Sequence, residues 1–142
     1  MSFSDNIKFS IKNEISEIAV LRESLSAFYS RHGFSAKMIN GLNLAIDEIL
    51  TNIISYGFSD KNRHEISVSV TAGNAEVLIE IKDDGWQFNP LEAPPPDVDM
   101  ALDDRPLGGL GIFLVKKLMD SIEYKHEEGR NILVMKKVFH LN

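Results

Sequence analysis

The chain has 142 residues, of which 44% are hydrophobic and 25% are charged. This length and composition predict a globular domain and exclude disordered and fibrous proteins. The formal net charge of −6 argues against nonspecific attraction to nucleic acid or to an anionic membrane surface. The lack of cysteine excludes disulfides, thiolate nucleophiles and cysteine-bound zinc. We therefore expect one domain over residues 1–142 that binds neither nucleic acid nor membrane directly.

The first predicted elements are a short strand and a helix. In the strand, apolar side chains alternate with polar ones, at Ile7, Phe9 and Ile11. Between residues 14 and 31, apolar side chains recur every three or four positions, at Ile15, Ile18, Leu21, Leu25 and Phe28. This spacing predicts an amphipathic helix that ends near Gly33.

A second helix is predicted between Ser35, a suitable N-cap, and Gly57. Its apolar stripe consists of Met38, Leu42, Ala45, Ile49 and Ile53. Glu48 and Asn52 stand four residues apart on this helix, so their side chains project together and can act on one ligand. They flank the apolar stripe, which indicates the rim of a cleft. A solvated polar strip is the alternative.

The second half of the chain predicts two hairpins separated by a long loop and a helix. The segments are strands over 64–72 and 75–83 joined across Gly73-Asn74, a proline-rich loop over 89–108, a helix over 109–120, and strands over 122–128 and 130–138 joined at Gly129. This order predicts an α+β protein, a two-layer sandwich in which helices cover one face of a mixed, mostly antiparallel sheet.

Two further motifs stand at the ends of predicted elements. In IKDDGWQFNP a strand ends in Asp83-Asp84-Gly85, which places a carboxylate beside a glycine that lets a planar ligand approach closely. Ordinary turn chemistry is the alternative. In PLGGLGIFLVKKLMD, glycines precede a helix whose free N–H groups favour phosphate oxygens. A flexible helix start is the alternative here, but the motifs together are more specific than any one alone.

In this order, the motifs resemble those of the GHKL ATPase superfamily with the Bergerat ATP-binding fold, and within it the anti-sigma-factor serine/threonine-protein kinases. LAIDEILTN is similar to the E-x-x-x-N motif, IKDDGWQFNP to the aspartate-glycine box, and RPLGGLGIFLVKKLMD to the second glycine box. The resemblance covers nearly the whole chain. The APPPD stretch and the DDGxxFxP pattern resemble stand-alone, RsbW-like regulators. Because no phosphoacceptor-histidine helix is visible, a sensor histidine kinase is disfavoured.

The resemblance implies roles for individual residues. Glu48 would be the general base, and Asn52 would give Mg²⁺ an oxygen ligand. Asp83 would accept a hydrogen bond from the exocyclic amine of adenine, with Gly85 leaving room for the base. The ATP phosphates would bind at the following glycines and lid cation, with 89–108 as the lid: Gly108, Gly109, Gly111 and Arg105.

Four further side chains stand out, and two of them, Arg105 and Trp86, have more than one interpretation. Asn131 is the nearest candidate for a threonine that many relatives place opposite the adenine-binding aspartate. Arg105 contacts phosphate, holds a partner or is a plain surface residue. Trp86 faces a partner or packs under the lid. His64, at the start of a strand, is expected to be a surface residue.

The resemblance also implies an activity and partners. It implies a cytoplasmic kinase that uses ATP and Mg²⁺ to phosphorylate an anti-anti-sigma (STAS-type) protein and that otherwise sequesters a sigma factor, as a homodimer. The N-terminal stretch MSFSDNIKFS has no export signal, and no apolar run is long enough to span a bilayer, in keeping with that location. The alternatives are a noncatalytic, nucleotide-dependent binding module and an ATPase part of another assembly. The glutamate at position 48 favours the kinase, because a pure binder needs no base.

Overall fold

The computed structural model describes residues 4–58, 60, 62–92 and 109–139. The elements follow the order β1 (Ser4–Lys12), α1 (Ser16–Arg31), α2 (Ala36–Tyr56), β2 (Glu65–Gly73), β3 (Glu76–Asp83), the 3₁₀ turn η1 (Pro90–Glu92), α3 (Gly109–Leu118), β4 (Ser121–Glu127) and β5 (Arg130–Val138). Every helix and strand expected from the sequence is present. Among the described residues, no helix combines the length and apolarity needed to cross a bilayer.

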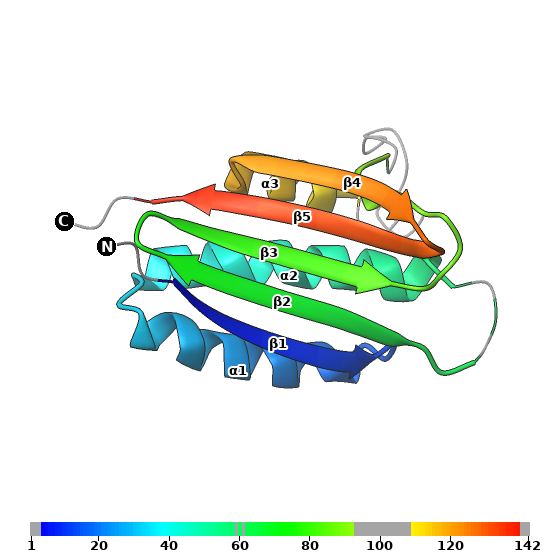
Figure 1. Ribbon diagram of the computed structural model, residues 1–142, viewed down its shortest axis with the longest axis horizontal. Helices are drawn as coiled ribbons and strands as arrows, with labels where there is room; N and C mark the ends of the chain where they lie inside the picture. The colour runs from blue at the N-terminus through cyan, green and yellow to red at the C-terminus, as the bar shows by residue number, and fades with distance from the viewer. Residues whose placement is uncertain (1–3, 59, 61, 93–108, 140–142) are drawn as a thin grey trace.

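The strands form one sheet in the order β1-β2-β3-β5-β4. All neighbouring strands that the structure describes pair antiparallel, so the described sheet lacks the parallel pair that a mixed sheet would contain. Figure 1 shows α1, α2 and α3 on one face of this sheet, with the other face uncovered. The predicted α+β architecture, with two layers and helices on one face, is confirmed.

The helix ends follow from local chemistry. α1 stops because Gly33 adopts a φ of 76°, which lets the N–H groups of Gly33 and Phe34 bond back to the carbonyls of Ser30 and Tyr29. The hydroxyl of Ser35 accepts a hydrogen bond from the Met38 N–H at 3.1 Å, so the predicted N-cap of α2 is confirmed.

Local contacts also shape the C-terminal elements. α3 ends two residues earlier than predicted, because the N–H of Asp120 bonds to the sheet at the carbonyl of Lys136. Glu128 and Gly129, between β4 and β5, both have positive φ, of 53° and 76°. Positive φ at both positions is the geometry of a tight hairpin turn whose twist matches that of the flanking strands.

The core lies between the helices and the covered face of the sheet. Strands β2 and β3 send every second side chain into it, and these side chains are almost completely buried: Ile66, Val68, Val70, Val77, Ile79 and Ile81. Asp83 continues this row at the end of β3. The sheet thereby delivers a carboxylate to the helix side of the molecule, beside the end of α2.

Candidate functional site

Asp83 is a buried carboxylate, and one of its two oxygens accepts hydrogen bonds from the protein. It is 5% exposed and continues the apolar row of Ile79 and Ile81. Its Oδ1 accepts hydrogen bonds from the N–H of Gly85 at 2.9 Å and from Nδ2 of Asn131 at 3.0 Å. Burial raises the pKa of this carboxyl above its ordinary value of 3.8, because desolvation outweighs the two hydrogen bonds. Within the described residues Oδ2 accepts no hydrogen bond.

Asn131 lies on β5, directly opposite Asp83 in the sheet. Besides its bond to Asp83, its Nδ2 donates to the backbone carbonyl of Trp86 at 2.9 Å. Its Oδ1 accepts from the N–H of Phe88 at 3.1 Å and from the hydroxyl of Tyr124. The expectation that Asn131 faces the aspartate is confirmed, and its carboxamide is used fully within the protein.

The loop after β3 packs against the C-terminal end of α2. A Cβ atom on Gly85 would lie 2.1 Å from the carbonyl oxygen of Gly57, so this close approach of two backbones requires glycine. We expected glycine at position 85 because it leaves room for a base. The structure gives a direct reason in the packing of two backbones. The N–H of Trp86 donates to that carbonyl at 3.1 Å, and its indole Nε1 donates to the carbonyl of Tyr56 at 2.8 Å. Trp86 thus caps α2, a role that neither of its two interpretations included.

Glu48 and Asn52 both stand on α2, but in different environments. Asn52 is 2% exposed, and its Nδ2 has no hydrogen-bond partner among the described residues. Because Asn52 is buried and not exposed to solvent, the solvated-strip interpretation is wrong for this residue. Leaving its Nδ2 without a partner is costly. Glu48 is half-buried. Burial raises the pKa of Glu48, and the charge of Asp47 raises it further. Asp47 itself pairs with Arg22 of α1.

The donor set fits a magnesium ion that arrives with a nucleotide. Within the described ranges, no group of three or more histidine, cysteine, aspartate or glutamate side chains could hold a metal. The carboxamide of Asn52 offers one oxygen, and Mg²⁺ takes few protein ligands when it also binds phosphates and water. The side-chain Oδ1 of Asn52 is therefore suited to be the one protein ligand of an ion held mainly by a nucleotide, whereas the unpartnered Nδ2 is a hydrogen-bond donor and would not bind a cation.

The predicted phosphate site and lid are described only in part. α3 begins at Gly109, and Gly111 also lies in its first turn. Gly108, Arg105 and the lid from residue 93 onward lie outside the described residues.

The lid's first residues form η1, which the sequence interpretation missed. Leu91 packs against the core, and its carbonyl accepts a hydrogen bond from Nζ of Lys116 on α3 at 3.2 Å. Its N–H bonds to Oδ1 of Asn89 at 2.9 Å. The local sequence indicates only the bond between Leu91 and Asn89, because Lys116 is distant in the chain.

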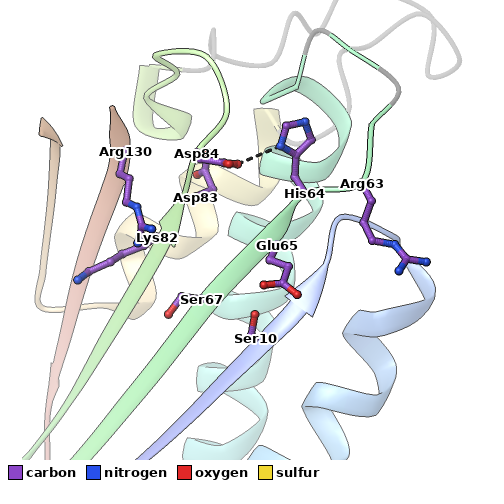
Figure 2. Close-up of a pocket in the computed structure, with 9 residues that line it drawn as sticks. All are labelled: Ser10, Arg63, His64, Glu65, Ser67, Lys82, Asp83, Asp84 and Arg130. Atoms are coloured by element: carbon purple, nitrogen blue, oxygen red, sulfur yellow. Dashed lines mark hydrogen bonds and ion pairs between the residues drawn. The ribbon is translucent and has the colours of Figure 1, made fainter. Parts of the chain in front are cut away.

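His64 lies partly exposed at the surface, where it is held between two carboxylates. Its Nε2 lies 2.7 Å from Asp60 and its Nδ1 lies 3.0 Å from Asp84, as Figure 2 shows for the second pair. Phe58 stacks on its ring at 4.4 Å. The hydrogen bond to Asp60, assisted by Asp84, raises the pKa of His64. His64 therefore fastens the loop before β2 to the residue after Asp83.

A hollow of about 490 Å³ lies near these residues on the uncovered face of the sheet (Figure 2). Its lining includes three cations, but Arg63 points away from Lys82 and Arg130, so they do not converge on one anion. A second hollow, of about 550 Å³, is lined by residues such as Met38 and Phe139. Neither lining includes Glu48 or Asn52.

The comparisons with known proteins agree with this arrangement. A family model described as "Histidine kinase-like ATPase domain" matches residues 11–137. The chain belongs to this family. It is 29% identical over 138 residues to the serine-protein kinase RsbW of Listeria monocytogenes, a match that covers 94% of this chain and 88% of the relative. Its identity to the RsbW of Bacillus cereus is 26% over 137 residues, covering 94% and 86%.

A solved structure shares the fold of this histidine kinase-like ATPase domain. The structure of the RsbU and RsbW domains of Rv1364c from Mycobacterium tuberculosis matches with a TM-score of 0.64 at 13% sequence identity. The match covers 94% of this chain and 32% of that longer one. The expected resemblance to RsbW-like members of the GHKL superfamily is thereby confirmed.

Proposed function

We propose that this protein is an ATP-dependent serine/threonine-protein kinase that phosphorylates an anti-anti-sigma protein of the STAS type and, in its other state, sequesters a sigma factor. The similarity to serine-protein kinases named RsbW supports the kinase class. The observation that carries the proposal is the buried Asp83, held by Asn131 and Gly85 beside the end of the helix that bears Glu48 and Asn52. The proposal places the protein in the cytoplasm, as one domain that pairs into a homodimer.

In the proposed site, each half of the nucleotide meets a different element. The uncommitted oxygen of Asp83 accepts a hydrogen bond from the exocyclic amine of adenine. Guanine carries a carbonyl at that position, so a carboxylate there selects adenine. The N–H groups at the start of α3 bind phosphate, together with Gly108 and Arg105. Mg²⁺, bound through Asn52 and the phosphates, would offset phosphate charge.

Glu48 is the proposed general base. Its carboxylate accepts the proton of the serine or threonine hydroxyl that attacks the terminal phosphorus, and the bond from that phosphorus to the bridging oxygen breaks to leave ADP. The direction of its pKa shift supports this role, because a base works best when its pKa approaches the working pH. Lowering the pH through this raised pKa protonates Glu48, so the transfer rate should fall there.

Phosphoryl transfer tests the kinase against the binding-module alternative. Purified protein is mixed with Mg-ATP and a candidate STAS-type protein, and phosphoserine is measured. We expect Glu48→Ala to slow transfer by about 10² to 10⁴-fold while ATP still binds. The matched control is Glu23→Ala, which removes an exposed carboxylate of α1 and should transfer at the wild-type rate.

Two outcomes contradict parts of the proposal. Wild-type transfer rates in Glu48→Ala would remove Glu48 from the base role. A wild-type protein that binds ATP and the antagonist without ever transferring phosphate would be the noncatalytic binding module.

A further inference from the structure

The two halves of the proposed nucleotide site lie on elements that are distant in the chain. Asp83 stands at the end of β3, whereas Glu48 and Asn52 stand on α2. A nucleotide that contacts both is bound well only if the elements already lie at the right separation, since ordering them on binding would weaken affinity. Something must therefore fix the end of β3 against α2.

Trp86 makes this connection on the side of α2. Its backbone N–H and its indole N–H donate to the carbonyls of Gly57 and Tyr56, at 3.1 Å and 2.8 Å. The last carbonyls of a helix accept hydrogen bonds from capping groups, as the carbonyls of Gly57 and Tyr56 do here. Asn52 lies one helical turn before Tyr56, so the indole holds the turn that follows the proposed magnesium ligand.

The same residue is also held from the sheet. The carbonyl of Trp86 accepts a hydrogen bond at 2.9 Å from Asn131, the side chain that also holds Asp83. Both polar groups of its backbone and its side-chain donor are thus engaged, two with α2 and one with β5. Gly85 completes the junction, because a Cβ there would collide with Gly57.

Core packing does not explain this tryptophan. Its surface is 53% exposed, and its aromatic neighbour Phe88 lies 5.6 Å away with its ring tilted. What distinguishes it from phenylalanine here is the single N–H that reaches Tyr56. The indole N–H is therefore the feature for which this position requires tryptophan.

We infer that Trp86 is a positioning residue that locks the adenine-binding end of β3 to the magnesium-binding helix α2. The two elements are thereby held at the separation at which one nucleotide contacts both. The inference rests on the proposed function, because it assigns the two halves their ligands. In this role Trp86 acts through its bonds to α2 and Asn131 and not through a contact of its own with the nucleotide. Its effect falls on ligands that span both halves.

Calorimetry with two ligands tests this inference. Adenosine probes the Asp83 half alone, and Mg-ATP probes both halves. In Trp86→Phe we expect the affinity for Mg-ATP to fall about tenfold, the size of one lost hydrogen bond. The affinity for adenosine should stay within about twofold. The gain in ATP affinity that Mg²⁺ produces should shrink by the same factor as the Mg-ATP affinity.

A near-isosteric replacement guards against a folding defect. Trp86 is the chain's one tryptophan, so benzothienylalanine supplied in its place exchanges only this N–H for sulfur and keeps the ring shape. It should reproduce the selective loss of Mg-ATP affinity. Val20→Ala, which trims an apolar side chain of α1 that is 63% exposed, is the matched control and should bind both ligands like wild type.

Each result has a distinct meaning. Equal losses for adenosine and Mg-ATP, or no loss in either variant, would overturn the positioning role while leaving the proposed function intact. A wild-type protein that binds neither adenosine nor Mg-ATP would overturn the proposed function, and the positioning role with it.

Discussion

Asp83 is a buried carboxylate whose ionisation works against folding. Its pKa is raised above 3.8 by desolvation, although Asn131 and Gly85 donate hydrogen bonds to it. A raised folded pKa means that the folded state prefers the protonated group. The protonated carboxyl contributes fully to the free energy of unfolding at pH values below its unfolded pKa. This contribution is lost as the pH rises through the folded pKa. Above the folded pKa of Asp83, the protein therefore carries a charge that its fold disfavours.

Replacing the carboxylate of Asp83 by an amide should change the stability of the protein and its affinity for ATP in opposite directions. We expect Asp83→Asn to be more stable than wild type at pH 7, because the neutral amide needs no desolvation of a charge. The difference should shrink as the pH falls through the folded pKa, where wild-type Asp83 gains its proton. Its affinity for ATP should fall about 10- to 100-fold, because the acceptor for the adenine amine is changed.

Thermal unfolding between pH 3.5 and 8, with ATP calorimetry at pH 7, checks both expectations. Glu123→Gln, which neutralises an exposed carboxylate of β4, is the control and should show no comparable pH-dependent gain. A lower stability of Asp83→Asn at neutral pH would show that hydrogen bonds to the charge outweigh its desolvation.

The residues of the candidate site differ in how far the sequence reveals them. Glu48 and Asn52 are recognisable because they flank the apolar stripe of a helix, and Asp83 because it ends the apolar row of a strand. Asn131 begins such a row on β5, before Leu133, and could be found by the same rule. The capping role of Trp86 depends on Tyr56, thirty residues away, and no local pattern announces such a contact.

At the scale of elements, the junction between α2 and the loop after β3 depends on two backbones in direct contact. Gly85 approaches Gly57 so closely that a Cβ atom would lie 2.1 Å from its carbonyl oxygen. Backbone cannot move aside as a flexible side chain can. The junction is therefore sensitive to a single methyl group.

We expect Gly85→Ala to lower the free energy of unfolding by roughly 3 kcal/mol, the upper range for overpacking. Urea unfolding with a common m-value measures the change. Gly41→Ala on α2 is a matched control, because its Cβ would meet Leu118 at an ordinary 3.6 Å. Alanine in a helix interior should raise stability by about 0.5–1 kcal/mol. Equal effects of the two substitutions would mean that the loop adjusts without cost.

Elements were predictable where their own sequence specifies them. Ser35 caps α2 and Gly33 ends α1, and both signals are visible in the printed sequence. η1 was not predictable, because the packing of Leu91 and its bond to Lys116 depend on residues brought together by the fold. α3 ends early for a similar reason, since Asp120 bonds to β5.

At the scale of the whole molecule, one face of the sheet carries the core and the other does not. This asymmetry explains why alternation in the strands and three- or four-residue spacing in the helices together predicted the two layers. The antiparallel pairing of β3 with β5, which brings Asp83 opposite Asn131, follows from topology and not from either strand alone.

Among the described residues, the hydroxyl of Tyr29 is one of three buried side-chain polar atoms without a hydrogen-bond partner, and it weakens the core. Tyr29 is fully buried, and its hydroxyl has no hydrogen-bond partner in the described part of the chain. Burial also raises the pKa of this tyrosine. Its ring stacks on Phe34 at 5.8 Å, a contact that phenylalanine would keep.

We therefore expect Tyr29→Phe to raise the free energy of unfolding by about 1 kcal/mol, because it removes an unsatisfied buried hydroxyl. The urea midpoint at constant m-value measures it. Leu25→Ala, at a site that is 0% exposed, should lower stability by about 2–5 kcal/mol and shows that the assay responds to the core. A lower midpoint for Tyr29→Phe would reveal a buried water as the missing partner.

The position of Trp86 gives the protein a built-in optical probe. Because it is the chain's only indole, all tryptophan emission comes from one point, at the boundary between solvent and the capped end of α2. The colour and intensity of that emission depend on the polarity around the ring. Intrinsic fluorescence therefore follows events at this junction without a dye or a labelled nucleotide.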